Sequence, residues 1–357
     1  CIRDSFEDAE DMRASFAEEK DRNIYSRYSN PNTSEFIEKV CQMEGAEAGF
    51  AFASGMAAVF STFAALLESG DHVVSCRSVF GSTHTLFTQI LPKWKISHSY
   101  FKIDEIESIP DLIQPNTKFI YAESPTNPAV DILDLKRLGD LAEAHNCLLV
   151  IDNCFATPYL QQPIKFGADL VIHSGTKLMD GQGRVLGGIT VGSADLVEKI
   201  YRFARITGPA LSPFNAWVLS KSLETLAVRV DKHCENALAV AEFLELHEQV
   251  NRVKYPFLDS HPAKEIAKQQ MKAGGTVVAF DVKGGLEAGR KFFDSLEWLS
   301  LSAHLGDTRT IVTHPASTTH SKLSPEDRAE SGITDGWVRS AVGGVYVEVI
   351  IADIEQA

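Results

Sequence analysis

The chain has 357 residues, 44% of them hydrophobic and 23% charged, which is long enough for one large and one small domain. Its net charge of −14 and its scattered basic residues argue against a nucleic-acid or anionic-membrane partner. The six cysteines form no CxxC pair and no apolar run could span a bilayer, so we expect a cytoplasmic protein with reduced thiols and no membrane partner.

The first part of the chain predicts an arm, then a strand, a tight turn and a helix. Residues 1–35 are charged and aperiodic, and Asn, Pro and Ser are frequent near their end, so we expect an extended arm. A helical pattern covers 36–43. An apolar strand at 48–53 then leads through "SGM" into a periodic helix that ends at 69–70.

The same alternation of strands and helices repeats to about residue 215. Helices are expected at 80–91 and 135–146. The expected strands lie at 72–76, 118–124, 147–153 and 168–174. Each strand is apolar throughout rather than alternating, which is typical of a mostly parallel sheet with helices on both faces. The predicted fold class is therefore α/β.

The C-terminal part predicts a smaller α+β domain. A long helix is expected over 218–246 and a strand over 274–282, whereas the β-branched run near the C-terminus does not support a last helix. We therefore predict an arm over 1–35, a large domain over 36–215 and a small domain over 216–357.

Polar residues directly follow several of the predicted strands. In open parallel sheets, ligands bind at the carboxyl ends of the strands. The helix that starts at Gly55 and Met56 offers free backbone N–H groups to a phosphate, and the hydroxyls of Ser174 and Thr176 can add donors. This edge of the sheet is thus a candidate phosphate site.

Asp152 and Lys177 add two further groups at the same edge. A carboxylate that ends an apolar strand should face a buried cation, such as a protonated pyridine nitrogen. Lys177 lies one crossover unit further along and could form a Schiff base with an aldehyde. Taken singly, these residues could equally be a helix cap and a surface charge. Together, phosphate, pyridinium and aldehyde describe pyridoxal 5′-phosphate.

Other cofactors fit the sequence poorly. The stretch "GQGRVLG" follows no strand and has one residue too many before its last glycine for a dinucleotide site, and no GxxxxGK[ST] loop occurs. His314 and His320 are not at a metal-binding spacing, so we predict no metal.

The motifs resemble those of the Cys/Met-metabolism family of fold-type I pyridoxal-phosphate enzymes, which have an aspartate aminotransferase-like fold. They occur in the family's order: "YSRYSNPNT", "ASGMAA", "ESPTNP", "DNCFATP", "ADLVIHSGTK", "THPASTTH" and "GITDGWVR". The resemblance implies that Lys177 binds the cofactor covalently and that Asp152 pairs with the ring nitrogen. The residues implied to hold the phosphate are Gly55, Met56, Ser174 and Thr176, with Tyr25 and Arg27 of a neighbouring subunit.

The resemblance also implies roles around the ring and the substrate. Asn127 would bond the ring's phenolic oxygen, and Phe80 stands where the family usually has a ring-stacking tyrosine. Arg339 would clamp the substrate α-carboxylate with two donors. Glu123 and His304 would lie in the substrate site, although the family usually has serine or asparagine at the position of His304.

Within the family, the sequence favours γ-replacement. Methionine γ-lyases usually read "YGC" where this chain has "FGS", while "SVFG" and "DGQGR" look like O-succinylhomoserine sulfhydrylases. We expect O-succinyl-L-homoserine and sulfide to give homocysteine and succinate, with Tyr25 assisting catalysis and Arg184 binding the succinyl carboxylate. The alternatives are a cystathionine γ-synthase, a γ-lyase of methionine or cystathionine, and an oligomer that has lost turnover. The shared site implies a homodimer, and the family is commonly a tetramer.

Overall fold

The computed structural model describes residues 5–20, 22–318 and 333–357, so His320 lies outside the described residues. The larger of its two sheets has seven strands in the order β1-β7-β6-β5-β4-β2-β3. These strands are β1 (Ala48–Phe52), β2 (His72–Cys76), β3 (Ser97–Phe101), β4 (Thr117–Glu123), β5 (Leu148–Asp152), β6 (Leu170–His173) and β7 (Gly188–Gly192).

Strand directions in this sheet bring several loops to one edge. Strands β2 to β6 pair in parallel, and β7 is antiparallel to both β6 and β1. Consequently β1 runs in the same direction as β6. The carboxyl ends of β1, β4, β5 and β6 therefore lie at the same edge of the sheet, as the sequence predicted.

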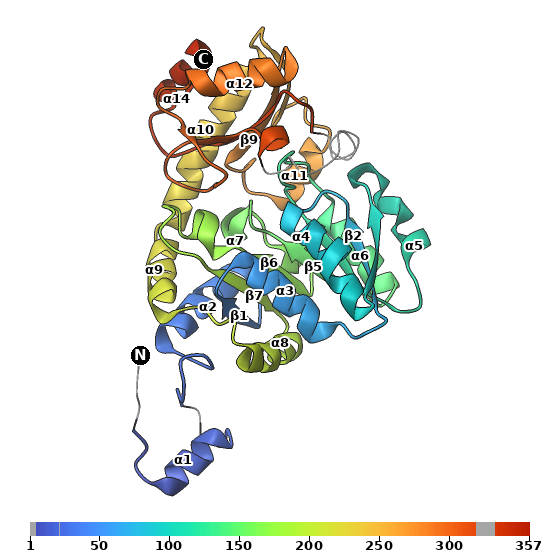
Figure 1. Ribbon diagram of the computed structural model, residues 1–357, viewed down its shortest axis with the longest axis vertical. Helices are drawn as coiled ribbons and strands as arrows, with labels where there is room; N and C mark the ends of the chain where they lie inside the picture. Colours follow the sequence, from blue (N-terminus) through green and yellow to red (C-terminus); the bar gives the residue numbers. More distant parts are fainter. Residues whose placement is uncertain (1–4, 21, 319–332) are drawn as a thin grey trace.

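Helices surround this sheet, and the second sheet lies above it (Figure 1). The helices before and around the large sheet are α1 (Ala9–Phe16), α2 (Pro31–Glu44), α3 (Gly55–Leu66), α4 (Gly81–Thr85), α5 (Ile109–Leu112), α6 (Leu135–Ala144), α7 (Thr157–Leu160), α8 (Ala194–Thr207) and α9 (Pro213–Leu223). Those that follow are α10 (Leu226–Glu245), α11 (Lys264–Gln270), α12 (Gly285–Ser295) and α14 (Val347–Gln356). Every described helix is too short or too polar to cross a membrane.

The second sheet has five strands in the order β10-β11-β12-β9-β8. They are β8 (Val250–Lys254), β9 (Val277–Val282), β10 (Ser300–Leu301), β11 (Ile311–Thr313) and β12 (Trp337–Ala341). One face packs with α10, α12 and α14 in a core that includes Phe280 and Val338. On the other face, Trp337 and Ala341 pack with Phe155 of the large sheet's loops. Because side chains alternate along a strand, Arg339 lies on this second face, toward the strand ends of the large sheet.

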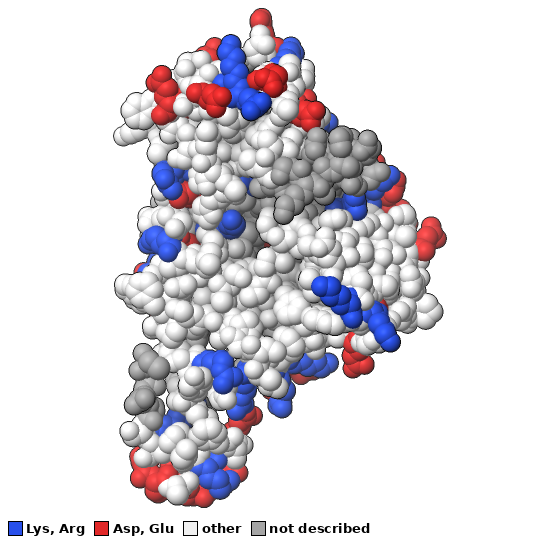
Figure 2. All heavy atoms as spheres, viewed as in Figure 1, with Lys and Arg blue, Asp and Glu red and all other residues white. Residues whose placement is uncertain are grey.

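Charged side chains of both signs are scattered over the face shown in Figure 2, where they form no patch of a single sign. The described cysteines are all unpaired thiols. No cluster of three metal-ligating side chains occurs within the described residues.

Two expectations for the N-terminal part differ from the structure. The residues expected as an extended arm contain α1, which the Asp8 side chain caps by accepting a hydrogen bond from Asp11 N at 2.8 Å. Helix α2 starts earlier than expected, because Asn30 caps it and Pro31 suits the first helical position. In both α1 and α2, a capping residue thus sets the first turn, a position that the pattern of apolar residues did not indicate.

Strands β3 and β7 were not expected. Strand β3 is an edge strand with the alternating sequence "SHSYF", so it lacks the continuous apolar signal of the buried strands. Strand β7 carries glycines because its neighbours approach closely: a Cβ on Gly192 would lie 2.2 Å from the carbonyl oxygen of Asp169.

The long helix expected over 218–246 is two helices, α9 and α10. The carbonyl oxygen of Ser222 accepts from the Thr225 hydroxyl at 3.1 Å and from the Arg229 guanidinium at 3.0 Å. These side chains satisfy a carbonyl at the end of α9 and allow the chain to break there. The helix expected at 80–91 is present, as α4 over Gly81–Thr85 followed directly by a π-helical segment over Leu86–Ile90.

The last helix, which the sequence did not support, is present as α14. Its Asp353 carboxylate accepts the backbone N–H groups of Glu297, Trp298 and Leu299 at 2.8–2.9 Å. Ile350 and Ile354 are buried in the core of the second sheet. Tertiary contacts therefore override the low helix propensity of the β-branched run.

Candidate active site

The start of α3 meets the loop after β6. Ser54 caps α3 by accepting a hydrogen bond from Ala57 N at 3.1 Å. A Cβ on Gly55 would lie 2.8 Å from the Cβ of Ser174, so only glycine allows this close approach. The first N–H groups of α3, which have no acceptor within the helix, therefore lie beside the Ser174 hydroxyl. The structure thus brings Gly55 and Ser174 together.

Lys177 lies in an irregular turn over Gly175–Met179, where its own backbone is not helical (φ −90°, ψ −128°). The turn is held at both ends. The Thr176 hydroxyl donates to the Gly187 carbonyl at 3.2 Å and accepts from Gly187 N at 3.1 Å. The Arg229 guanidinium donates to the carbonyl of Leu178 at 2.7 Å and to that of Met179 at 3.3 Å.

The amine of Lys177 has a lowered pKa because it is largely removed from water, and the charge of Arg339 acts in the same direction. Its Nζ lies 3.3 Å from Nδ1 of His304. A lowered pKa favours the neutral amine, which is the form that attacks a carbonyl carbon.

Asp152 and Glu123 are adjacent in the register of β5 and β4. Backbone N–H groups donate to them, from Cys154 to Asp152 at 3.0 Å and from Phe80 to Glu123 at 2.8 Å. Burial raises the pKa of Asp152 to about 6. Burial and the nearby Asp152 charge raise the pKa of Glu123 well above its usual range. A cation bound beside Asp152 and Glu123 would stabilise their ionised forms.

Arg339 is a buried cation whose described acceptors are all neutral oxygens. Its NH1 donates to Asn127 Oδ1 at 3.1 Å, and its NH2 donates to the His304 carbonyl at 3.0 Å and to Thr313 Oγ1 at 3.1 Å. Its buried Nε has no hydrogen-bond partner among the described residues. Burial lowers the pKa of Arg339 to about 10. An anionic ligand such as a carboxylate would compensate this charge.

Arg27 contacts α8, and Tyr25 lies beside Arg27 and Tyr28. The Arg27 guanidinium donates to the Arg205 carbonyl and lies over the rings of Tyr25 and Tyr28. Tyr25 is 57% exposed. The segment that contains α1 projects away from the rest of the chain (Figure 1). A role of these residues in a neighbouring subunit's site stays a prediction.

Arg184 is held by its own loop. Its Nε donates to Asp180 Oδ1 at 3.0 Å, and its NH2 donates to the Ser222 hydroxyl at 2.6 Å. The predicted contact with a succinyl group is untested. Phe80 caps the start of α4 and is 38% exposed, so its ring is accessible for stacking.

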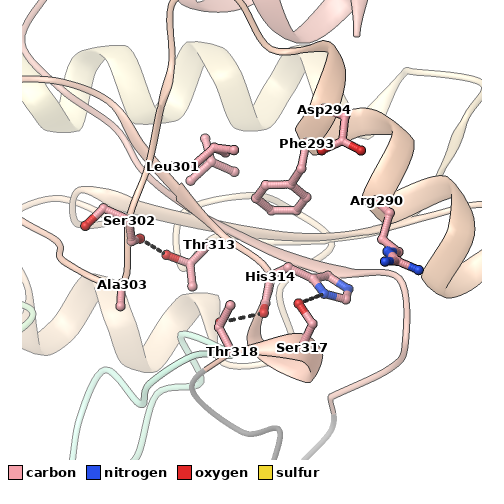
Figure 3. A pocket seen from close by; sticks show the side chains of 11 residues that line it. Arg290, Phe293, Asp294, Leu301, Ser302, Ala303, Thr313, His314, Ser317 and Thr318 are labelled. Atoms are coloured by element: carbon pink, nitrogen blue, oxygen red, sulfur yellow. Dashed lines mark hydrogen bonds between the residues drawn. The ribbon is translucent and has the colours of Figure 1, made fainter.

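Sequence reasoning missed Thr313 and Arg229. Thr313 has a hydroxyl that donates to the Ser302 carbonyl and accepts from Arg339. It borders a cavity of about 390 Å³, drawn in Figure 3. Neither residue lies at a predicted strand end. Thr313 opens the motif "THPASTTH", which could have pointed to it, whereas the sequence carried no signal for Arg229.

Comparisons with known proteins identify the family of this chain. A model of the family described as Cys/Met metabolism PLP-dependent enzyme matches residues 4–357. The O-succinylhomoserine sulfhydrylase of Pseudomonas aeruginosa is 46% identical over 349 residues, which cover 98% of this chain and 87% of that protein. The L-methionine gamma-lyase of Fusobacterium nucleatum is 41% identical over 355 residues, which cover 98% of this chain and 90% of that protein.

A solved structure gives the same result for the fold and the cofactor. It is described as an O-acetylhomoserine (thiol)-lyase from Campylobacter jejuni and contains a pyridoxyl-lysine phosphate. It matches with a TM-score of 0.94 at 34% identity over 99% of this chain and 92% of that chain. The predicted fold class is thereby confirmed.

The residues at the strand ends fit pyridoxal 5′-phosphate. The Lys177 amine suits an aldehyde, the Asp152 and Glu123 carboxylates suit a ring cation, and the start of α3 at Gly55 suits a phosphate. Each group of the cofactor thus meets a chemically matching group at one edge of the sheet.

Proposed function

The chain belongs to the family of Cys/Met metabolism PLP-dependent enzymes, and from this premise we propose that it catalyses γ-replacement on an O-acylhomoserine. The proposed reaction converts O-succinyl-L-homoserine and sulfide into L-homocysteine and succinate. The observation that carries it is a Lys177 amine of lowered pKa near Arg339, a buried cation that donates only to neutral oxygens within the described residues. The name of the Pseudomonas relative and the "FGS" sequence support this substrate choice.

We propose that Lys177 holds pyridoxal 5′-phosphate and that Asp152 keeps its ring nitrogen protonated. Gly55, Met56, Ser174 and Thr176 would hold the phosphate. When bound, the cofactor supplies an aldehyde that bonds amino groups and a ring that accepts electrons from the adjacent carbon. Asn127 would bond the ring oxygen, and Phe80 would stack on the ring.

The chain's own residues then bind the amino acid and move its protons. Arg339 would bind the α-carboxylate and thereby orient Cα toward Lys177. Nζ of Lys177 would take the proton from Cα, since its lowered pKa favours the neutral amine. Glu123 and His304 would line the substrate site, and Tyr25 would assist from another subunit.

We also propose that the enzyme is a cytoplasmic homo-oligomer with shared sites. The unpaired described cysteines suit a reducing compartment. The exposed Tyr25 supports a contact with a neighbouring subunit, as do Leu186, Phe214 and Trp217, which are apolar and 48–65% exposed. A dimer would complete the site, and two dimers would form a tetramer.

A γ-lyase is the second candidate, because methionine γ-lyases are 41% identical to this chain. It would keep every proposed cofactor residue. The test is an assay of the purified enzyme with succinyl- and acetylhomoserine, each with sulfide or cysteine. We expect homocysteine from the succinyl ester and sulfide. Formation of cystathionine from cysteine would indicate a cystathionine γ-synthase. Release of α-ketobutyrate without added sulfide would indicate a γ-lyase.

The cofactor site has its own test. Borohydride reduction of the coloured enzyme should leave a pyridoxyl adduct on Lys177, detected by mass spectrometry. A protein that stays colourless after incubation with pyridoxal 5′-phosphate would contradict the proposal.

A further inference from the structure

His304 contacts the group expected to do the chemistry. Its Nδ1 lies 3.3 Å from Nζ of Lys177. The loop that carries it is pressed against the turn of the lysine, since a Cβ on Gly306 would lie 2.6 Å from the backbone nitrogen of Leu178. Backbone contact therefore holds the two side chains together.

The second ring nitrogen of His304 lies near Gly183, as does a carboxylate oxygen of Asp307. Nε2 is buried and has no hydrogen-bond partner among the described residues. It lies 3.9 Å from the position that a Cβ on Gly183 would take, and Asp307 Oδ2 lies 3.3 Å from the same position. Because Nδ1 faces a donor, the hydrogen of the neutral ring belongs on Nε2. The imidazole thus contacts an amine through Nδ1, and the Asp307 carboxylate is close enough for its charge to act on the ring.

The surrounding charges act on both bases. Burial and the charges of Lys177 and Arg339 lower the pKa of His304, while Asp307 and Asp180 oppose this effect. Burial and Arg339 also lower the pKa of Lys177, while Cys154 opposes this effect. Two bases with reduced proton affinity therefore lie within reach of one proton.

We propose that His304 accepts a proton from the protonated amine of Lys177. The Nζ–H bond of the ammonium breaks, an Nδ1–H bond forms, and the positive charge moves from the ammonium to the imidazolium, which the nearby Asp307 charge favours. The amine that remains is neutral and can take a proton from carbon. This role deepens the proposed function and rests on it, because Lys177 is the proton carrier there.

The first test uses the cofactor-free protein and needs no turnover. Diethyl pyrocarbonate modifies neutral imidazoles, and mass spectrometry gives the labelling rate of each histidine between pH 5 and 8. In Lys177→Met, we expect His304 to be labelled roughly three-fold more slowly at pH 6, because loss of the ammonium charge leaves more of the ring protonated. His247 is the internal control: its side chain is 25% exposed and contacts Glu355, and its labelling rate should not change.

An unchanged labelling profile of His304 in a variant with wild-type oligomeric state would overturn the proposal. If Lys177→Met does not fold, Lys177→Gln gives the same comparison. Because the cofactor and substrate are absent, this result is independent of whether the enzyme performs γ-replacement.

The second test uses the loaded enzyme. In His304→Asn, we expect kcat to fall about 100-fold or more, KM for the amino acid to change little, and one ionisation to disappear from the acid limb of kcat/KM. Ser302→Ala is the matched control, since its hydroxyl accepts from the backbone of His304 at 3.2 Å and its loss would only loosen the loop. An acid limb that persists in His304→Asn would exclude the proposed proton transfer.

Discussion

Asp152→Asn should stabilise the cofactor-free protein at pH 8. Burial raises the pKa of Asp152 from 3.8 to about 6. A difference of about 2 in pKa corresponds to ~3 kcal/mol. Ionising this carboxylate in the folded protein lowers the free energy of unfolding by that amount. The amide is similar in shape, carries no charge and can still accept from Cys154 N.

The pH dependence gives the sign of this effect. A carboxylate whose pKa is raised in the folded protein stabilises the fold below the unfolded pKa, and this contribution is lost as the pH rises through about 6. The increase in the free energy of unfolding caused by Asp152→Asn should therefore be absent below pH 4, grow between pH 4 and 6, and stay constant above pH 6. The same variant should bind pyridoxal 5′-phosphate more weakly, because the ring cation loses its partner.

The assay is the thermal midpoint of the cofactor-free protein as a function of pH. Asp353→Asn is the matched control of opposite sign, because its backbone N–H donors lower the pKa of Asp353. That carboxylate stabilises the fold above its unfolded pKa, so its variant should lose stability at pH 8. A lower midpoint for Asp152→Asn at both pH 5 and pH 8 would refute the idea of an uncompensated carboxylate at this site.

Three further variants test the proposed roles. Arg339→Lys should lower kcat/KM about 100-fold, because one ammonium cannot reproduce the two-pronged contact, and a loss below ten-fold would argue against a carboxylate there. Gly55→Ala should weaken cofactor binding at least about ten-fold, measured by absorbance titration, because its Cβ would lie 2.8 Å from that of Ser174. Arg184→Ala should lower kcat/KM more for succinyl- than for acetylhomoserine, and equal losses would contradict the succinyl contact.

The sequence predicted the edge of the sheet where the site lies, because its signal is local. Buried parallel strands are apolar throughout, and polar residues such as Asp152 and Lys177 interrupt that pattern where each strand ends. The pairing of β4 with β5 then places Glu123 beside Asp152.

Contacts between distant segments could not be predicted in this way. Arg339 and Thr313 meet across two strands of the second sheet, and His304 reaches Lys177 over 127 positions of sequence. The helix that contains Ile350 depends on packing against side chains elsewhere in the fold. Such contacts leave no periodic trace in a single sequence.

Helix α10 links the two halves of the proposed site mechanically. Near the start of α10, Arg229 donates hydrogen bonds to two carbonyls of the turn that carries Lys177. Further along, the same helix packs against the sheet that carries Arg339. A substitution that shifts α10 would therefore disturb both the turn that carries Lys177 and the sheet that carries Arg339.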